Sequence, residues 1–136
     1  MPNMENKLKV MITGGCGFVG SETTKLFNEK GIEVVNYDIM LKNDFRDIGD
    51  LRNFILKHQP DRILHLAAIA RFAEADKDPK LAYETNVLGT KNVANIASKY
   101  HIPLVYASTG SVYMPIKQDP PITEEFPAMG NSVYGC

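Results

Sequence analysis

A glycine-rich run follows directly on a short apolar stretch near the N-terminus. Residues 13–20 read Thr-Gly-Gly-Cys-Gly-Phe-Val-Gly, and residues 8–12 before them are mostly apolar. Where a strand turns sharply into a helix against a diphosphate, the turn has no room for Cβ atoms, and the helix N-terminus offers unpaired N–H groups to the phosphates. The glycines fit this role in two registers, Gly14, Gly17 and Gly20 or Gly15, Gly17 and Gly20. The run therefore predicts a diphosphate-binding turn.

An acidic residue follows at a matching distance. Residues 33–38 read as a second strand that ends in Asp38, 18 residues beyond Gly20. Near this distance an acidic side chain receives the ribose hydroxyls of a bound dinucleotide, and a carboxylate there repels the 2′-phosphate of NADP. We therefore expect NAD rather than NADP as the cofactor. The alternative is a glycine turn and an unrelated surface aspartate.

Strand-like and helix-like segments alternate along the chain. Strands are expected at 8–12, 32–37, 62–67 and 104–107. Helices are expected at 19–30, around Leu51, Phe54, Ile55 and Leu56, and from Pro79 to about Tyr100. The first helix would carry four residues along one stripe and stop at Gly31: Val19, Thr23, Leu26 and Phe27. This alternation predicts an α/β fold, a Rossmann-type doubly wound parallel sheet with helices on both faces.

Two further expectations concern the residues after Asp38 and the second helix. The segment leaves room for only a stub of strand before Asp44. Either Asp47 or Asp50 can cap the second helix, which Gln59-Pro60 ends.

Composition limits the possible classes of protein. The 136 residues suit one domain, and a net charge of −1 favours neither nucleic acid nor an anionic membrane as partner. No apolar run approaches the ~20 residues that span a bilayer. The two cysteines, Cys16 and Cys136, offer no disulfide framework, so we expect a cytoplasmic protein. Cys16 is interpreted as a small filler of the tight turn, and no metal site is predicted.

Hydroxyl side chains follow the strand at 104–107. Ser108, Thr109 and Ser111 would lie beyond the carboxyl end of that strand, where open α/β sheets bind ligands. A hydroxyl can both donate and accept a hydrogen bond, which suits the holding of a substrate alcohol during proton transfer. The alternative is that these residues only cap a turn.

Five motifs in order make the chain resemble a known family. They occupy residues 13–20 (Thr-Gly-x-x-Gly-x-x-Gly), 44–47 (Asp-Phe-Arg-Asp), 65–68 (His-Leu-Ala-Ala), 86–90 (Asn-x-x-Gly-Thr) and 108–113 (Ser-Thr-x-x-Val-Tyr). Residues 131–135 then look like the beginning of a Tyr-x-x-x-Lys motif. The chain resembles the extended short-chain dehydrogenases/reductases over residues 7–136, in particular the NAD-dependent epimerase/dehydratase group that acts on nucleotide sugars.

The resemblance implies roles for individual residues. The diphosphate would be lined by Gly14, Gly17, Phe18, Val19 and Gly20. Asp38 would bind the adenosine ribose, and Asp44 and Phe45 would flank the adenine, with the carboxylate accepting from its amino group. Three residues would pass close to the ribose and diphosphate, where small side chains permit a near approach: Leu66, Ala67 and Ala68. Asn86 would order the nicotinamide side of the site.

The resemblance also implies the catalytic pair. Thr109 would hydrogen-bond the reacting substrate hydroxyl, and Tyr134 would be the general base. A phenol titrates near pH 10 and needs a nearby cation to act at neutral pH. In the family this cation is a lysine four residues later, which here would be position 138, beyond Cys136. We therefore expect the chain to be the N-terminal portion of such an enzyme, inactive by itself and able to bind NAD weakly at most. A natural minimal nucleotide-binding module is the alternative.

Several functions remain open within this resemblance. The leading one is an NAD-dependent epimerase or dehydratase acting on a UDP-, dTDP- or GDP-sugar. The short segment between Asp38 and Asp44 is closer to dTDP-4-dehydrorhamnose reductases and GDP-fucose synthases, so a 4-keto-sugar reductase is a second possibility. A non-catalytic nucleotide-binding regulatory subunit is a third. The resemblance further implies a homodimer that pairs through the helix at 79–100. Within the site, His65 is interpreted as a packing residue.

Overall fold

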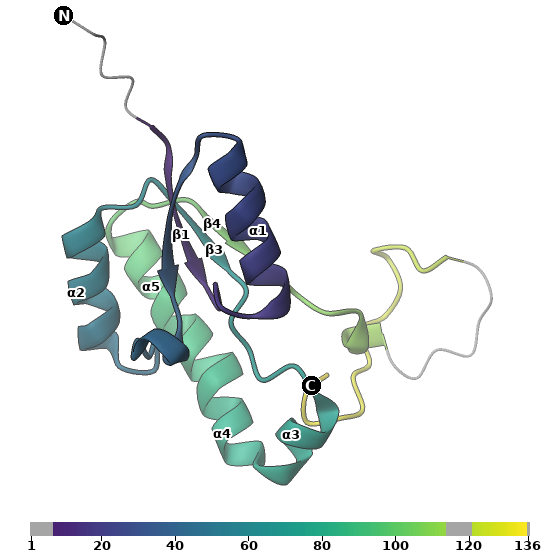
Figure 1. Ribbon diagram of the computed structural model, residues 1–136. Coiled ribbons are helices and arrows are strands. Elements are labelled where there is room, and N and C mark those ends of the chain that lie inside the picture. The colour runs from purple at the N-terminus through teal and green to yellow at the C-terminus, as the bar shows by residue number, and fades with distance from the viewer. Residues whose placement is uncertain (1–6, 114–120, 136) are drawn as a thin grey trace, which may run out of the picture.

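One parallel sheet organises the protein. The computed structural model describes residues 7–113 and 121–135. Four strands lie in the order β2-β1-β3-β4, and every neighbouring pair is parallel (Figure 1). Their bounds are Lys9–Thr13 for β1, Glu33–Tyr37 for β2, Arg62–His65 for β3 and Leu104–Tyr106 for β4. The predicted parallel sheet is confirmed, and β3 and β4 end slightly earlier than predicted.

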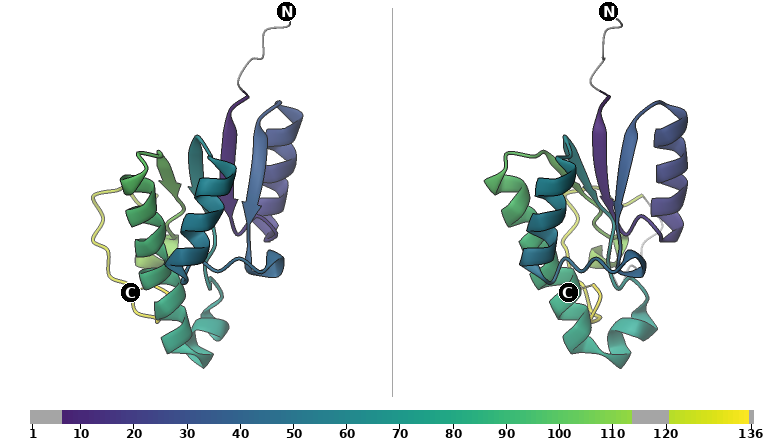
Figure 2. Two further views of the ribbon diagram at one scale, coloured as in Figure 1. Left: turned by 90° about the vertical axis from the view of Figure 1, so that its left-hand side faces the viewer. Right: turned by 60° about the vertical axis from the view of Figure 1, so that its left-hand side comes forward.

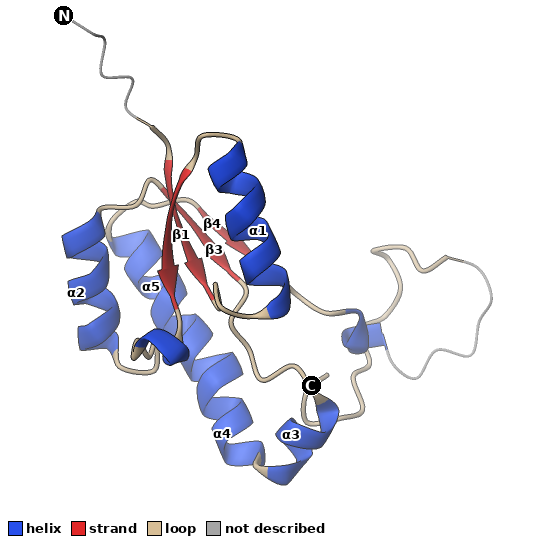
Figure 3. Ribbon diagram, viewed as in Figure 1, coloured by secondary structure: helices blue, strands red, loops and turns tan. Residues whose placement is uncertain are grey.

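Helices cover both faces of this sheet, as predicted. Helix α1 (Phe18–Glu29) lies on one face, while α2 (Ile48–His58) and α5 (Thr90–Lys99) lie on the other (Figures 2 and 3). The main core fills the layer between the sheet and α2 and α5. Its most deeply buried apolar side chains include Met11, Tyr37, Leu51, Ile63 and Val93.

Helix α1 packs differently from the prediction. Of the predicted stripe, Thr23 and Phe27 are partly buried, whereas Val19 and Leu26 are 60% and 48% exposed. Gly20 is the buried residue of α1, and Thr24 donates to Asn36 Oδ1 of β2 at 3.1 Å. The helix therefore approaches the sheet through small and hydroxyl side chains, and Val19 and Leu26 remain exposed.

The segment after β2 contains no stub of strand, contrary to the prediction. It forms a single 3₁₀ turn, Ile39–Leu41, because the Asp38 side chain accepts from Met40 N at 2.9 Å and Lys42 adopts a left-handed φ of 64°. Asp47 is the residue that caps α2, accepting from the N–H groups of Gly49 and Asp50.

The predicted long helix is confirmed in extent but has an irregular middle. It begins as α4 (Pro79–Tyr83), continues through a π-helical turn at Glu84–Gly89 and ends as α5. The prediction missed α3 (Phe72–Lys77), a helix too short to give a periodic pattern, and a 3₁₀ turn at Gly110–Tyr113. Within the described residues, no helix combines the length and the apolar character that crossing a membrane requires.

Candidate functional site

The order in which successive strands join the sheet reverses between β1 and β3. The chain runs outward from β1 to β2 and then crosses back to β3 on the other side of β1. In open α/β sheets ligands bind at this point, beyond the carboxyl ends of the strands. A cavity of about 420 Å³ opens there. Of the residues predicted to bind the cofactor, it is lined by Gly14, Gly17, Asp38, Asp44, Phe45, Leu66, Ala67 and Ala68.

The glycine turn lies directly against the end of β3. Gly14 has a φ of +70°, and a Cβ there would come within 2.9 Å of Ala67 N and Cα. Gly20 has a similar constraint, because a Cβ on it would collide with the carbonyl oxygen of Gly14. These two positions therefore need glycine for different reasons: Gly14 for its conformation and a close approach, Gly20 for the close approach alone.

The N-terminus of α1 presents unsatisfied donors. Its first helical hydrogen bond runs from Ser21 N to Gly17 O, and no side chain caps the helix. Among the described residues the N–H groups of Phe18, Val19 and Gly20 consequently have no acceptor. The side chains of Phe18 and Val19 point away from the cavity, and Phe18 is 90% exposed. These two residues can thus contribute to an anion site through their backbone.

Asp38 connects β2 to the glycine turn. Its Oδ2 accepts from Cys16 N at 3.0 Å, and its Oδ1 accepts from Met40 N at 2.9 Å. The residue is buried, with 8% of its surface exposed, yet it lines the cavity. Each carboxylate oxygen retains a lone pair, so Asp38 can accept further hydrogen bonds from a ligand.

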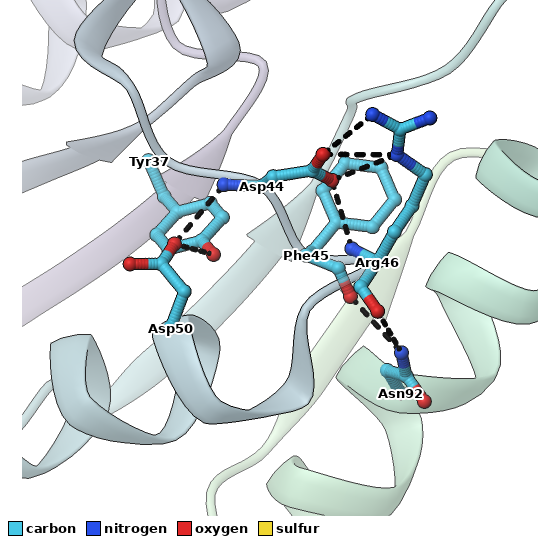
Figure 4. A network of polar contacts seen from close by, with 6 residues as sticks. All are labelled: Tyr37, Asp44, Phe45, Arg46, Asp50 and Asn92. Atoms are coloured by element: carbon cyan, nitrogen blue, oxygen red, sulfur yellow. Dashed lines mark hydrogen bonds and ion pairs between the residues drawn. The ribbon is translucent and has the colours of Figure 1, made fainter.

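The segment after the 3₁₀ turn is held from two sides (Figure 4). Asp50 Oδ2 accepts from Tyr37 Oη at 2.5 Å and from Asp44 N at 3.0 Å. On the other side, Asn92 Nδ2 donates to the carbonyl oxygens of Phe45 and Arg46. Hydrogen bonding to Asp50 and burial, the larger cause, raise the pKa of Tyr37. These contacts fix the backbone that carries Asp44 along the edge of the cavity.

Asp44 and Phe45 lie at the cavity in different ways. Asp44 forms an ion pair with Arg46, whose Nε and Nη2 donate to the carboxylate, and this hydrogen bonding lowers the pKa of Asp44. The ring of Phe45 is instead buried, packed against Gly89 and edge-on to His65. Phe45 therefore lines the cavity while its ring packs into the interior.

Asn86 supports the cavity wall rather than facing the large cavity. Its Oδ1 accepts from Ile69 N at 2.8 Å, and its Nδ2 donates to Ile69 O at 3.0 Å. Asn86 stands in the π-helical turn, an irregularity that is frequent at functional sites. It anchors the loop that continues from Leu66, Ala67 and Ala68.

A smaller cavity of about 60 Å³ adjoins the first at Ala67 and Ala68. Thr109 and Tyr134 both line it, together with Asn86 and Ser108. Thr109 Oγ1 accepts from Ser111 N at 3.1 Å, and the Tyr134 ring packs edge-on against Phe72 of α3, with centroids 5.7 Å apart. The fold thus brings the two predicted catalytic residues, 25 positions apart in sequence, to one small hollow.

A comparison with protein families agrees with this geometry. The model of the "NAD dependent epimerase/dehydratase family" matches residues 10–136. The chain belongs to this family.

Individual relatives are also similar. The chain is 32% identical over 124 residues to a UDP-glucose 4-epimerase of Rhizobium meliloti, covering 81% of this chain and 38% of the relative. Among solved structures, a Thermus thermophilus UDP-glucose 4-epimerase in complex with NAD superposes with a TM-score of 0.87 at 28% identity, covering 93% of this chain and 46% of that one. A dTDP-4-dehydrorhamnose reductase of Clostridium acetobutylicum superposes with a TM-score of 0.83 at 28% identity, covering 93% and 45%. The chain therefore spans less than half the length of these family members.

The cavity of about 420 Å³ is also lined by residues to which the sequence assigns no cofactor contact. They are Cys16, Ile39, Met40, Arg46, Ile69, Leu81 and Thr85. The signal for Cys16 and Arg46 was their place inside two of the motifs, whereas Leu81 and Thr85 reach the cavity only because the long helix passes beneath it. No cluster of His, Cys, Asp and Glu within the described ranges could hold a metal ion.

A larger hollow of about 510 Å³ lies elsewhere, on the outer face of α1. It is lined by side chains of that one helix, among them Phe18, Val19 and Leu26. Polar groups from several elements do not converge there. We therefore assign the functional site to the cavity of about 420 Å³ beyond the carboxyl ends of the strands.

Proposed function

We propose that this chain is the cofactor-binding portion of an NAD-dependent nucleotide-sugar epimerase or dehydratase, with residues 1–136 belonging to one NAD-binding domain. The observation that carries the proposal is that three groups suited to a dinucleotide lie at the cavity of about 420 Å³. Free N–H groups at the start of α1, the Gly14 turn against Ala67 and the carboxylate of Asp38 meet there. This set of groups fits a dinucleotide.

Each part of the cofactor has a matching group. The diphosphate would accept from the N–H groups of Phe18, Val19 and Gly20, because a helix N-terminus favours negative charge. The adenosine ribose hydroxyls would donate to Asp38. The adenine amino group would donate to Asp44, beside the N–H of Phe45, which has no acceptor among the described residues.

The smaller cavity would receive the reacting part of the sugar. NAD, when bound, supplies the chemistry of accepting a hydride from a sugar carbon. Thr109 would orient the sugar hydroxyl through its Oγ1, and Tyr134 Oη would take the hydroxyl proton. The lysine that would stabilise the phenolate corresponds to position 138, outside the 136 residues. We therefore expect turnover only from a protein that continues through that position.

Calorimetric titration with NAD tests cofactor binding by the 136 residues. We expect binding that is measurable and weaker than about 1 μM, because contacts to the nicotinamide half are incomplete. NADP should bind less tightly, since its 2′-phosphate would meet Asp38. The absence of any heat of binding with millimolar NAD would contradict the proposal.

A protein extended beyond Cys136 tests the reaction itself. The sugars to assay are UDP-, dTDP- and GDP-linked, with UDP-glucose first, because the similar proteins from R. meliloti and T. thermophilus are UDP-glucose 4-epimerases. Tyr134→Phe should abolish turnover while NAD binding is retained, since the ring contact with Phe72 does not need the hydroxyl. Full activity of this variant would remove Tyr134 from the proposal.

A 4-keto-sugar reductase is the second candidate. Two observations favour it: the single 3₁₀ turn between Asp38 and Asp44, and the similarity to the C. acetobutylicum reductase. The two functions differ in cofactor balance. A reductase consumes one reduced cofactor for each sugar converted, whereas an epimerase shows no net consumption.

The long helix supports the proposal of a homodimer. Tyr83, Val87 and Leu88 are 56%, 46% and 42% exposed along its outer side. Sedimentation of the extended protein should give a dimer that Val87→Glu dissociates. A monomer at all concentrations would contradict pairing through this helix.

A further inference from the structure

His65 stands at the centre of a hydrogen-bonded chain that the proposed function does not use. The side chain ends β3 and is completely buried. Its Nδ1 lies 2.6 Å from Thr13 Oγ1, and its Nε2 lies 2.9 Å from Thr90 Oγ1. Phe45 packs edge-on to the imidazole and Tyr106 stacks on it. The ring thus joins the end of β1 to the first residue of α5.

The donors around Thr13 determine where the protons lie. Thr13 Oγ1 accepts from Leu66 N at 3.1 Å and from Ala67 N at 3.2 Å. A hydroxyl oxygen has two lone pairs and one proton, so the proton of Thr13 is left for His65 Nδ1. Nδ1 is then an acceptor, and Nε2 carries the ring proton and donates it to Thr90.

These bonds act on the geometry of the cofactor turn. Thr13 immediately precedes Gly14, and Ala67 is the residue against which Gly14 packs without room for a Cβ. Leu66 N also donates to Thr13 O at 3.2 Å, so it is the Ala67 amide that depends on Thr13 Oγ1 for its hydrogen bond. Thr13 Oγ1 presents its lone pairs to these amides when its own proton has an acceptor elsewhere. His65 is that acceptor, and Thr90 sets the orientation of the imidazole from the helix side.

We propose that His65 is a positioning residue for cofactor binding: a neutral imidazole with its proton on Nε2 holds the Thr13 hydroxyl so that the end of β3 stays against the glycine turn. This inference rests on the proposed function for its effect on NAD. The hydrogen-bond chain itself can be measured without any ligand.

The first test is nitrogen NMR of the histidine-labelled 136-residue chain without ligand. We expect one imidazole, assigned by its loss in His65→Asn, with a protonated Nε2 and a bare Nδ1 at neutral pH. The other two histidines, His58 and His101, serve as internal references. A proton on Nδ1, or an imidazolium at neutral pH, would overturn the proposal.

The second test separates positioning from general stability. Thr13→Val should accelerate hydrogen exchange at the Ala67 amide and weaken NAD binding about tenfold, whereas Thr13→Ser, which keeps the hydroxyl, should restore both. Thr23→Val is the matched control, because its hydroxyl only donates to Val19 O on the outer side of α1. Equal exchange and equal NAD affinity in Thr13→Val and Thr23→Val would overturn the positioning role. Failure of the unmodified chain to bind NAD, with the Nε2 proton and the Ala67 protection as expected, would instead count against the proposed function and the cofactor role together.

Discussion

Asp38 Oδ2 accepts a hydrogen bond from Cys16 N at 3.0 Å, so the carboxylate that ends β2 is held against the glycine turn that follows β1. The two features that carried the sequence interpretation are therefore one structural unit. A ligand that contacts the turn also meets the carboxylate, and changes at either residue should affect the same binding event.

Asp38→Asn should weaken NAD binding about tenfold, about 1.4 kcal/mol, and reduce the preference for NAD over NADP. The amide keeps one acceptor for the Cys16 or Met40 N–H but loses the charge that favours ribose hydroxyls and repels a 2′-phosphate. Calorimetry with both cofactors measures the change. Asp76→Asn, on the exposed side of α3, is the control. An unchanged NAD to NADP ratio in Asp38→Asn would contradict this role.

The variants Gly14→Ala and Gly31→Ala separate the effect of a left-handed backbone conformation from the effect of a close approach to Ala67. Both glycines have left-handed φ values, 70° and 74°, but a Cβ at Gly31 would meet nothing within 4 Å, whereas one at Gly14 would meet Ala67. Gly31→Ala should destabilise the fold by about 1 kcal/mol and leave NAD affinity unchanged. Gly14→Ala should cost more and should also abolish NAD binding.

Urea unfolding and calorimetry measure the two effects. Equal behaviour of the two variants in both measurements would show that the close approach of Gly14 to Ala67 has no consequence.

His65 should make the fold sensitive to mild acid. Burial lowers its pKa to about 4, from an ordinary value of 6.5. Because the unfolded chain then binds a proton that the folded chain does not, the free energy of unfolding falls as the pH drops from about 6.5 towards 4, by about 3 kcal/mol in all.

Urea unfolding at a series of pH values measures this loss. Tyr106 is the titratable group that contacts the imidazole, and burial alone causes the lowered pKa. The loss should disappear in His65→Asn and persist in His101→Gln. A stability that is independent of pH over this range would contradict the neutral, buried imidazole.

NAD should protect Cys16 from alkylation. The thiol is exposed and lines the cavity beside Asp38. Desolvation and, to a lesser extent, the charge of Asp38 raise its pKa, so the reaction should be slow at neutral pH. In a Cys136→Ser background, the only thiol left is Cys16. Mass spectrometry should show slower labelling with NAD, and equal rates with and without NAD would indicate that the cofactor binds elsewhere.

The sequence was informative where local chemistry decides the structure. Glycine spacing, the Asp38 position and the order of the segments predicted the turn, the parallel sheet and the helices on both faces. The prediction was wrong where tertiary packing decides. In α1, Val19 and Leu26 are exposed because Gly20 and Thr24 make the contact with the sheet. The 3₁₀ turn after Asp38 is a local feature that residue types do not single out, since it depends on the Asp38 side chain accepting from Met40 N.

The contrast between local chemistry and tertiary packing also applies to the residues of the site. No pattern in the sequence indicates that both polar groups of Asn86 bind Ile69, or that Phe45 packs under Gly89, since these contacts depend on a π-helical turn that aligns the long helix with two loops. Similarly, the sequence alone favours a packing role for His65. Its bonds to Thr13 and Thr90 join residues 52 and 25 positions away.

In the proposed site, backbone amides at the start of α1 bind the diphosphate of NAD. Titration of the nitrogen-15-labelled chain with NAD, followed by amide chemical shifts, tests it most directly. We predict that the largest saturable shifts belong to Phe18, Val19 and Gly20, with inorganic diphosphate moving the same amides. Saturable shifts confined to another surface, with these three amides unmoved, would show that the diphosphate does not bind at the start of α1.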